Sequence, residues 1–404
     1  MTTQRIFCPL HGNIELSPLI CEILNTPEIQ RLRDVKQLGA TYFVFPSANH
    51  TRLEHSLGVC HLAGIMGKNL QKNHPELDIQ DRFIELLKIA GLIHDIGHGP
   101  FSHLYDNYIK SRDEPDHEER GLIIFDKIIK RENIALTKEE VYEIHKMVNP
   151  KNRDIFNWKY QIIANKSCQI DVDKIDYILR DSFHLGIPHS GEFKKLLEDV
   201  RLNKTQANAI ELVWDSRLQF DIYSLFATRY RLHKKVYTHH TVKGFEYIII
   251  DIMKGLHRHC RLNGNLKPLS EQPDSIVTQF CYNNSENIMA KNLITRNHPK
   301  LVGELVIREK NGDKPVEKLR VILDLFVEEL KIGFVSGNNQ NPLANVYYYD
   351  KSNKNGEAFR INLTDSSFII PEKFQERIVR VYRTPESSLK EANEFWKEFK
   401  KKYE

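Results

Sequence analysis

His94 and Asp95 form an adjacent imidazole–carboxylate pair at the end of an apolar helical run, and this pair is the strongest chemical signal in the chain. A second histidine, His55, lies upstream, and a second carboxylate, Asp173, lies in an acidic run downstream. Two imidazoles and two carboxylates suit Fe, Mn, Zn or Co, and they admit Mg²⁺ when substrate phosphates complete the shell. A His-Asp pair alone is more often a core histidine beside a helix-end carboxylate. The order His…His-Asp…Asp within apolar helices favours a divalent metal site instead.

Three further histidines, His98, His103 and His117, follow the pair within a short stretch. Histidine titrates closest to neutral pH, so these residues suit general acid or base catalysis on a phosphate ester. Asp106 lies three residues after His103 and could orient that imidazole within one helical turn. Glu118 follows His117 and could extend the relay. Each histidine taken singly is more often structural or on the surface, but as a cluster beside a metal at least one is expected to be catalytic.

Cations that could hold a polyphosphate occur in two segments. Lys174 follows Asp173 directly, so a metal ligand and a phosphate-binding group share one segment. Arg229, His233 and Tyr237 recur at a spacing of four, which predicts one face of a helix. Arginine can bind phosphate through two hydrogen bonds, and tyrosine can pack against a sugar or base. The same basic run could instead be a solvated helix face or a nucleic-acid patch, because Lys, Arg and Tyr are interleaved there.

The composition describes an ordinary globular protein of 404 residues, with 41% hydrophobic and 28% charged residues. Its formal net charge of +4 is small for this length and gives little reason to invoke nucleic acid. Six scattered cysteines without a Cys-x-x-Cys pair argue against a disulfide framework and a cysteine zinc module. We find no signal-peptide pattern and no apolar run long enough to span a membrane. We therefore expect an intracellular protein, in the cytoplasm or the nucleus, with no membrane partner.

Helical periodicity dominates the chain up to about residue 300. The segments with apolar residues at helix spacing are 17–37, 57–72, 82–93, 121–129, 138–148, 171–181 and 221–254. One short strand pair is expected near 209–214. Gly97, Gly99 and Pro100 end the helix that carries His94 and Asp95. The glycines after this pair could give it the freedom to direct both side chains at one ion.

The pattern changes after residue 300. Alternating segments that predict strands cover 300–307, 344–349 and 358–363, and the turn sequence Asn353–Gly356 joins the last two. A loop is expected at 338–342, and a helix of mixed charge at 387–402. The Walker phosphate loop and the Gly-x-Gly-x-x-Gly fingerprint are both missing from the sequence, which disfavours ATPases, kinases and dinucleotide enzymes. The sequence predicts a mainly α fold, with a helical catalytic core at 1–300 and a smaller α+β lobe at 301–404.

These motifs together resemble the HD-domain superfamily of metal-dependent phosphohydrolases, and within it the sterile-alpha-motif and HD-domain dNTP triphosphohydrolases. The resemblance covers nearly the whole chain. Its matching segments are His11–Leu16, Gln30–Arg33, Lys36–Gly39, Arg52–Val59, His94–His103, Asp171–Gly186, Thr228–His239, Pro371–Phe374 and Arg380–Tyr382. No sterile-alpha-motif domain is expected, because the chain begins almost directly at the HD core.

The resemblance implies a role for each matching residue. His55, His94, Asp95 and Asp173 match the metal ligands, while His98, His103 and His117 match the histidines around the scissile phosphate. His103, Asp106 and Glu118 match a proton relay. The residues that match substrate contacts are Arg52, Lys174, Tyr177 and Arg229 for the triphosphate and the nucleotide, Gln37, Asp181 and Tyr237 for the deoxyribose, and His233 for the base side of the pocket, with Leu38 as a further substrate contact.

The reaction that the resemblance implies is attack of water on the α-phosphorus of a dNTP. It releases the deoxynucleoside and intact triphosphate, and it would serve control of the dNTP pool. The family also implies a homo-oligomer, either a dimer or a tetramer. Members of the family are activated by guanine nucleotides between subunits, and the residues that still match such a regulatory site are Gln30, Arg33, Arg217, His239 and Arg296.

Other positions of that regulatory site depart from the family. Asn25 replaces the acidic residue that reads guanine, and the stretch Arg5–Cys8 lacks an Asn-Asp pair. Asp215 and Asp221 stand where a basic and a neutral residue are expected near an activator phosphate. Carboxylates that face a triphosphate weaken its binding. The sequence therefore predicts basal activity without GTP, or a different activator nucleotide.

Two alternatives remain open at the level of sequence. One is another HD phosphodiesterase or nucleotidase, which would not release inorganic triphosphate from dNTPs. The other is a single-stranded nucleic-acid-binding protein, which the basic run Arg229–Lys235 and the tail Lys397–Lys402 would suit. Salt-dependent binding to oligonucleotides that survives loss of His94 and Asp95 would favour that second alternative.

Overall fold

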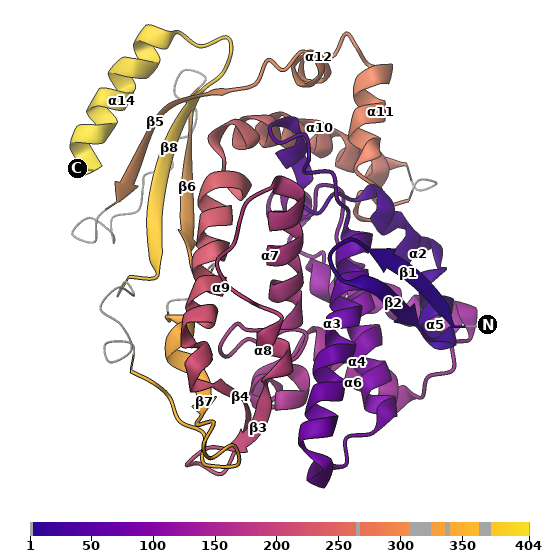
Figure 1. The fold of residues 1–404 in the computed structure, drawn as a ribbon. Coiled ribbons are helices and arrows are strands. Elements are labelled where there is room, and N and C mark those ends of the chain that lie inside the picture. Colours follow the sequence, from indigo (N-terminus) through magenta and orange to yellow (C-terminus); the bar gives the residue numbers. More distant parts are fainter. Residues whose placement is uncertain (1–2, 264–266, 308–324, 336–339, 363–372, 404) are drawn as a thin grey trace.

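The computed structural model describes residues 3–263, 267–307, 325–335, 340–362 and 373–403, and helices make up most of it (Figure 1). The chain opens with an antiparallel hairpin of β1 (Gln4–Cys8) and β2 (Gly12–Leu16). The helices that follow are α1 (Pro18–Leu24), α2 (Pro27–Gln30), α3 (Arg52–Asn73), α4 (Asp81–Ile93), α5 (His117–Glu132), α6 (Lys138–Val148), α7 (Val172–Leu185), α8 (Lys195–Glu198), α9 (Gln219–Leu232), α10 (His240–Leu262), α11 (Ser275–Asn283), α12 (Ile288–Ile294) and α14 (Leu389–Tyr403).

Helices α3, α4 and α7 form the centre of the helical body. Helix α3 starts in a capping box, because Thr51 and Glu54 satisfy each other's backbone N–H groups. It packs closely on α4 at Gly91, where a Cβ atom would approach the backbone of Cys60 to 3.0 Å. Asp171 is the N-terminal cap of α7, and its side chain accepts a hydrogen bond from the Lys174 amide at 2.8 Å. These caps and contacts fix the ends of the helices from which the candidate ligands project.

Two small sheets flank this body. Strands β3 (Arg201–Lys204) and β4 (Ile210–Asp215) are antiparallel, and β7 (Tyr347–Tyr349) adds to β4 in parallel. Strands β5 (Lys300–Ile307), β8 (Gln375–Arg383) and β6 (Leu325–Gly333) form an antiparallel sheet in that spatial order. Helix α14 covers β5 on the outer side, while β6 lies next to α9 of the body (Figure 1). In the described parts of the chain, no helix combines the length and the apolar character needed to cross a bilayer.

Several predicted elements match the structure closely, and two predicted long helices are wrong. Helix α6 and strand β5 have the predicted bounds, and α4 and α14 lie within two residues of theirs. The predicted helix at 17–37 is divided, because Pro27 starts a new helix and a 3-10 turn follows it. The predicted helix at 221–254 is also divided, because a π-helical turn at His233–Tyr237 separates α9 from α10.

The C-terminal part differs more from the prediction. The predicted strand at 358–363 is wrong in its described part, where only Phe359 forms a bridge, with Tyr348. Positions 338–339 of the predicted loop, Leu363, and 371–372 of the matching segments lie outside the described residues. The hairpin β1–β2 and strands β6 and β8 were not predicted. Strand β7 of the predicted C-terminal lobe pairs with β4, and Tyr348 belongs to the hydrophobic core of the helical body. This part of the lobe therefore packs into the body. The division into two domains at residue 300 stays a prediction.

Candidate metal centre and active site

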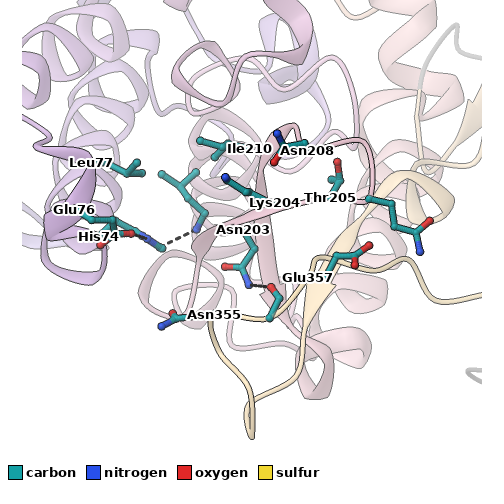
Figure 2. Close-up of a pocket in the computed structure, with 13 residues that line it drawn as sticks. His74, Glu76, Leu77, Asn203, Lys204, Thr205, Asn208, Ile210, Asn355 and Glu357 are labelled. Atoms are coloured by element: carbon teal, nitrogen blue, oxygen red, sulfur yellow. Dashed lines mark hydrogen bonds and ion pairs between the residues drawn. The ribbon is translucent and has the colours of Figure 1, made fainter.

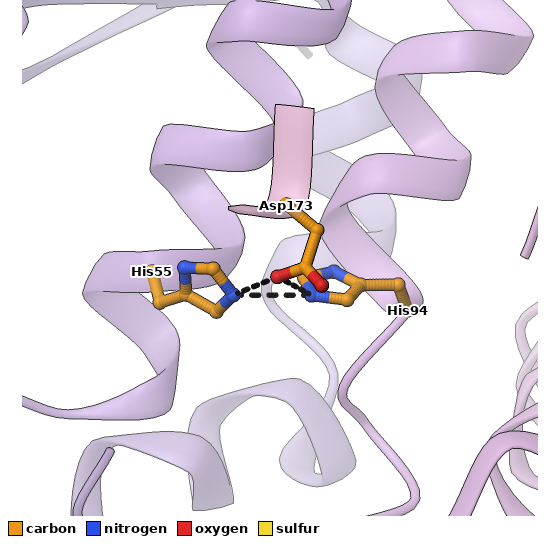
Figure 3. A group of neighbouring side chains, drawn as sticks. All are labelled: His55, His94 and Asp173. Atoms are coloured by element: carbon orange, nitrogen blue, oxygen red, sulfur yellow. Dashed lines mark hydrogen bonds and ion pairs between the residues drawn. The ribbon is translucent and has the colours of Figure 1, made fainter. Parts of the chain in front are cut away.

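Three predicted ligands from three helices meet at one point (Figure 3). His55 lies in the first turn of α3, His94 directly follows α4, and Asp173 lies in the first turn of α7. The Nε2 atoms of the two histidines are 3.2 Å apart, and Asp173 Oδ1 lies 2.9 Å from His55 Nε2 and 3.6 Å from His94 Nε2. Ligands around one ion at about 2.1 Å are themselves about 3.0 to 3.4 Å apart. The three atoms therefore have the spacing of a coordination shell.

Asp95 completes this group from the segment after α4. Its carboxylate oxygens lie 3.5 Å from His94 Nε2 and 3.7 Å from His55 Nε2. The guanidinium of Arg52, which is only 4% exposed, forms an ion pair with the same carboxylate. Burial acts to raise the pKa of Asp95, but Arg52 and the neighbouring imidazoles lower it well below its usual range. Asp95 is therefore a carboxylate anion at neutral pH and can act as a fourth ligand.

The hydrogen bonds of the two histidines show that the site needs a cation. His94 Nδ1 lies 2.8 Å from the carbonyl oxygen of Gly91, so Nδ1 carries the proton and Nε2 presents a lone pair. His55 Nδ1 lies 2.8 Å from Asp176 Oδ2, which gives His55 the same tautomer. Two lone pairs and two carboxylates then face one another. A positive charge between them stabilises this arrangement, and either a proton on His55 Nε2, which lies 2.9 Å from Asp173 Oδ1, or a divalent metal ion can supply it. The residues therefore fit a divalent metal.

The electrostatics of His55 support the same conclusion. Burial alone would lower the pKa of His55, but hydrogen bonds to Asp173 and Asp176 raise it to about 10. Burial likewise opposes ionisation of Asp173, while His55 and His94 lower its pKa below the usual range. The negative charges of Asp173 and Asp176 thus stabilise a positive charge in the site. A bound metal ion supplies that charge without a proton.

A second cluster lies beside the first and contains the predicted catalytic residues. The rings of His98 and His117 stack with centroids 4.0 Å apart, and His103 meets His98 edge-on at 5.2 Å. Asp106 Oδ2 lies 2.6 Å from His117 Nδ1, and Arg120 binds the other oxygen of Asp106 at 2.8 Å. Burial and the nearby Arg52 lower the pKa of His98 well below its usual range, so His98 is neutral.

The partner of Asp106 differs from the one that the spacing suggested. The expectation that Asp106 orients His103 is wrong, since its hydrogen bond goes to His117. The spacing of three assumed a regular α-helix, whereas the chain from Tyr105 to Ile109 forms a π-helical turn. The Glu118 carboxylate faces Lys166, whose Nζ lies 3.8 Å away. Among the described contacts, Glu118 therefore does not extend the hydrogen-bonded pair of Asp106 and His117.

The predicted phosphate-binding cations lie on helices that border these clusters. Lys174 follows Asp173 in α7 and is buried, with Nζ 3.5 Å from Gln169 Oε1. Arg229 of α9 is also buried and donates to the carbonyl oxygen of Gly333 at 2.7 Å. The ring of Tyr177 lies edge-on to that of His55, with centroids 6.5 Å apart.

The predicted deoxyribose residues are connected through one carboxylate. Asp181 binds His50 Nε2 at 2.7 Å through one oxygen and accepts the Tyr237 hydroxyl through the other. The ring of His233 packs edge-on against Tyr237 at 4.8 Å. The backbone N–H of Gln37 donates to the carbonyl oxygen of His50. The buried side-chain oxygen Oε1 of Gln37 has no hydrogen-bond partner. Leu38 follows Gln37 and is half-buried.

The basic run after Arg229 is used within the molecule. Arg231 donates to the carbonyl oxygen of Pro188, and Lys234 forms an ion pair with Glu376 at 2.5 Å. Lys235 is exposed. These contacts occupy Arg231 and Lys234, and binding of nucleic acid by this run stays a prediction from the sequence.

The predicted regulatory residues lie outside the metal centre. Arg33 binds Gln30 Oε1 at 2.7 Å, and Arg296 donates to the carbonyl oxygen of Phe43 at 2.8 Å. His239 forms the N-terminal cap of α10. The exposed Arg217 is paired with Asp215, the unusual carboxylate noted in the sequence, at 2.7 Å.

A cavity of about 490 Å³ lies elsewhere, near the C-terminal end of α3 (Figure 2). Its walls come from His74 and Glu76, the β3–β4 hairpin and residues 355–357. None of the predicted site residues lines it. The cavity is therefore separate from the metal centre.

Three important residues were missed in the sequence. Asp176 is fully buried and binds His55 Nδ1, His11 Nε2 at 2.6 Å and Arg180 at 2.8 Å. Its position three residues after Asp173, on one face of α7, was a usable signal. Arg180 lies four residues after Asp176, on the same face of α7, whereas no local spacing connects His11 to Asp176.

Comparison with known proteins supports the same assignment. Residues 52–181 match the HD domain family. The chain is 31% identical to the deoxynucleoside triphosphate triphosphohydrolase SAMHD1 of Bos taurus, over 96% of this chain and 76% of that protein. It is 30% identical to the SAMHD1 homologue of Dictyostelium discoideum, over 92% and 76% of the two chains. It is also 32% identical to the HD domain-containing protein L394 of Acanthamoeba polyphaga mimivirus, over 90% and 87%. The chain therefore belongs to the HD-domain deoxynucleoside triphosphate triphosphohydrolase family.

Proposed function

We propose that the protein hydrolyses dNTPs to a deoxynucleoside and inorganic triphosphate, and that it thereby controls a dNTP pool. The observation that carries this proposal is the convergence of His55, His94, Asp95 and Asp173 beside a second histidine cluster. The relatives named as dNTP triphosphohydrolases match almost the whole chain, which supports the same reaction here.

A divalent metal held by the four ligands would polarise a phosphoryl oxygen and lower the pKa of water. The residues around it suit the remaining tasks of the reaction. Arg52, Lys174 and Arg229 would neutralise charge that develops on the triphosphate, because they border the metal centre and are themselves buried. Fixed cations in such surroundings act more strongly than solvated ones.

The leaving deoxynucleoside oxygen needs a proton. His117 is held at Nδ1 by Asp106, so its Nε2 is free to give or take a proton at the substrate. Asp106 is itself fixed by Arg120, which keeps it an anion. His103 is accessible and next to this pair, so His103 and His117 are the candidate proton-transferring residues. Glu118 could take part in proton transfer only if its side chain moved away from Lys166.

Recognition of the sugar would depend on the His50–Asp181–Tyr237 group. Both carboxylate oxygens of Asp181 are already bonded, so the Tyr237 ring is held in one position. A fixed ring beside the sugar leaves no room to accommodate a 2′-hydroxyl. Gln37, Leu38, Tyr177 and His233 would complete the nucleotide pocket, and the unpartnered Gln37 Oε1 is ready to accept a hydrogen bond.

Regulation would differ from guanine-nucleotide control. Asp215 neutralises Arg217, which removes a cation that an activator phosphate would need. We therefore infer basal activity without GTP, in a homo-oligomer of two or four subunits. Six unpaired, buried cysteines support an intracellular location. Fe, Mn, Zn and Co all suit the mixed imidazole–carboxylate donors, with Mg²⁺ bound through substrate phosphates.

The direct test is incubation of nucleotide-free protein with each dNTP and each matching ribonucleotide, with the divalent metal varied. Chromatography of the products should show a deoxynucleoside and triphosphate from dNTPs and little product from ribonucleotides. Monophosphate plus pyrophosphate, or diphosphate plus orthophosphate, would instead indicate another HD phosphohydrolase.

A further inference from the structure

Asp274 is a buried carboxylate that does not serve its own helix. It stands at the N-terminal cap position of α11, where aspartate usually accepts a hydrogen bond from the first turn. Its side chain makes no such cap bond and is instead directed at two distant loops. Oδ1 accepts from the Phe101 amide at 2.6 Å, and Oδ2 accepts from the Lys36 amide at 2.8 Å. The residue is 7% exposed, so water does not replace these partners.

Both loops lead to Arg52. On one side, the residue before Lys36 is Val35, whose carbonyl oxygen accepts the Arg52 amide at 2.9 Å. On the other side, the residue after Phe101 is Ser102, whose Oγ accepts Arg52 Nε at 2.6 Å. The four hydrogen bonds make a closed ring that passes through the Asp274 carboxylate, the two loops, and the backbone and side chain of Arg52.

The Phe101 side of this ring has an unfavourable backbone. Phe101 and Ser102 have φ values of 55° and 54°, in the left-handed region that bulky residues seldom adopt. Such a conformation persists only where surrounding contacts impose it. The hydrogen bond to Asp274 is one of those contacts, and a Cβ atom at Gly39 would lie 3.5 Å from the Phe101 carbonyl oxygen, so this turn is closely surrounded. This turn places Ser102 against Arg52 and leads directly into His103.

The charge of Asp274 suits this role. Burial raises the pKa of Asp274 to about 6, although the two backbone N–H groups and nearby Arg52 and Arg31 favour the anion. Arg31 reinforces the same loop, because its guanidinium donates to the carbonyl oxygens of Ile96 and His98 at 2.8 Å each. At neutral pH the carboxylate therefore makes two charge-assisted hydrogen bonds.

We propose that Asp274 is a positioning residue that acts through Arg52, holding its guanidinium in place for both Asp95 and the substrate triphosphate. This inference rests on the proposed function, in which Arg52 contacts the triphosphate. Asp274 itself touches neither the metal ligands nor, on this geometry, the substrate. Its effect on turnover is therefore expected to depend on an intact Arg52.

A double-mutant cycle tests this dependence. Asp274→Asn keeps the shape but offers one amide N–H where an acceptor is needed, so kcat/KM should fall about tenfold or more. Arg52→Lys should also lower kcat/KM, because lysine cannot reach Ser102 and Asp95 together. The double variant should be no less active than Arg52→Lys alone. Independent effects that multiply in the double variant would overturn the proposal.

The control is Glu271→Gln, which removes a charge from the same segment without touching either loop. It should keep wild-type kcat/KM and metal content. Asp274→Asn should keep metal content as well, because Asp274 makes no hydrogen bond to any of the four ligands. If Asp274→Asn lost its bound metal, the proposal that Asp274 acts only by positioning Arg52 would be overturned.

Hydrogen exchange provides a test that needs no substrate. In Asp274→Asn the amides of Lys36 and Phe101 should lose protection together, while Glu271→Gln retains it. If the wild-type protein releases no triphosphate, the proposed function fails, yet this coupled protection would still support the ring. If Asp274→Asn does not fold, the two wild-type amides can be compared directly. They share one acceptor residue and should be equally protected, so a difference of more than about tenfold would overturn the ring.

Discussion

Replacing Asp176 with asparagine should weaken the metal centre without altering any of its four proposed ligands. Asp176 is fully buried and holds His55 Nδ1 at 2.8 Å, which directs the Nε2 lone pair of His55 at the ion. The same carboxylate binds His11 and Arg180. An asparagine has one acceptor oxygen in place of two, and its amide group would face donors.

The structure sets the size of both expected effects. Loss of a carboxylate that orients a ligating histidine typically costs about 10- to 100-fold in metal affinity, or about 1.4 to 2.7 kcal/mol. Arg180, at 1% exposure, would also lose the anion that neutralises it. Breaking a buried ion pair in this way costs about 3 to 5 kcal/mol of the free energy of unfolding. The variant should therefore bind metal weakly and unfold at a lower temperature.

The assay is a competition titration of Mn²⁺ against a chelator, together with thermal unfolding of the metal-free protein. Asp126→Asn is a matched control, because Asp126 pairs with His145 at 2.9 Å on an exposed part of α5, away from the centre. That control should keep wild-type metal affinity and lose less than about 1 kcal/mol of stability. If folded Asp176→Asn binds Mn²⁺ as tightly as wild type, the carboxylate does not orient His55.

Three further outcomes are expected. Burial and nearby His11 lower the pKa of His61 to about 4, so the folded protein keeps His61 neutral while the unfolded chain takes up a proton near pH 6.5. This group therefore contributes stability above about pH 6.5, and up to about 3 kcal/mol is lost as the pH falls to 4. Urea unfolding of His61→Gln should show a smaller loss over that range than wild type, and an equal loss would contradict the assignment. Tyr237→Phe removes the bond to Asp181 and should narrow the preference of kcat/KM for dNTPs over ribonucleotides by about tenfold; an unchanged ratio in steady-state kinetics would remove Tyr237 from sugar recognition. Nucleotide-free protein should turn over a pyrimidine dNTP at a rate that added GTP changes little, whereas strict dependence on GTP would refute the account of Arg217 and Asp215.

The candidate metal centre could be identified from sequence because its signals are local and chemically specific. His94 and Asp95 are adjacent, Asp173 lies in a helix with clear apolar periodicity, and all of the candidate ligands lie at helix ends. Helices α4 and α7 have clear amphipathic patterns, so their existence was also predictable.

What the sequence did not predict depends on tertiary contacts. The π-helical turn at Tyr105–Ile109 moved Asp106 from His103 to His117, and no periodicity marks such a turn. Asp274 reaches loops more than 170 residues away along the chain, so its role was visible only in the fold. Strand β8 lies between β5 and β6 although it follows both in sequence, and such a crossover has no local signal.

Hydrolysis of a dNTP in ¹⁸O-labelled water tests the central claim most directly. If water attacks the α-phosphorus, the bond from phosphorus to the 5′ oxygen breaks, and mass spectrometry should find one ¹⁸O in the released triphosphate and none in the deoxynucleoside. Asp173→Asn should release neither product. Label in the deoxynucleoside, orthophosphate as the first product, or full activity of Asp173→Asn would contradict a metal centre that acts on the innermost phosphate.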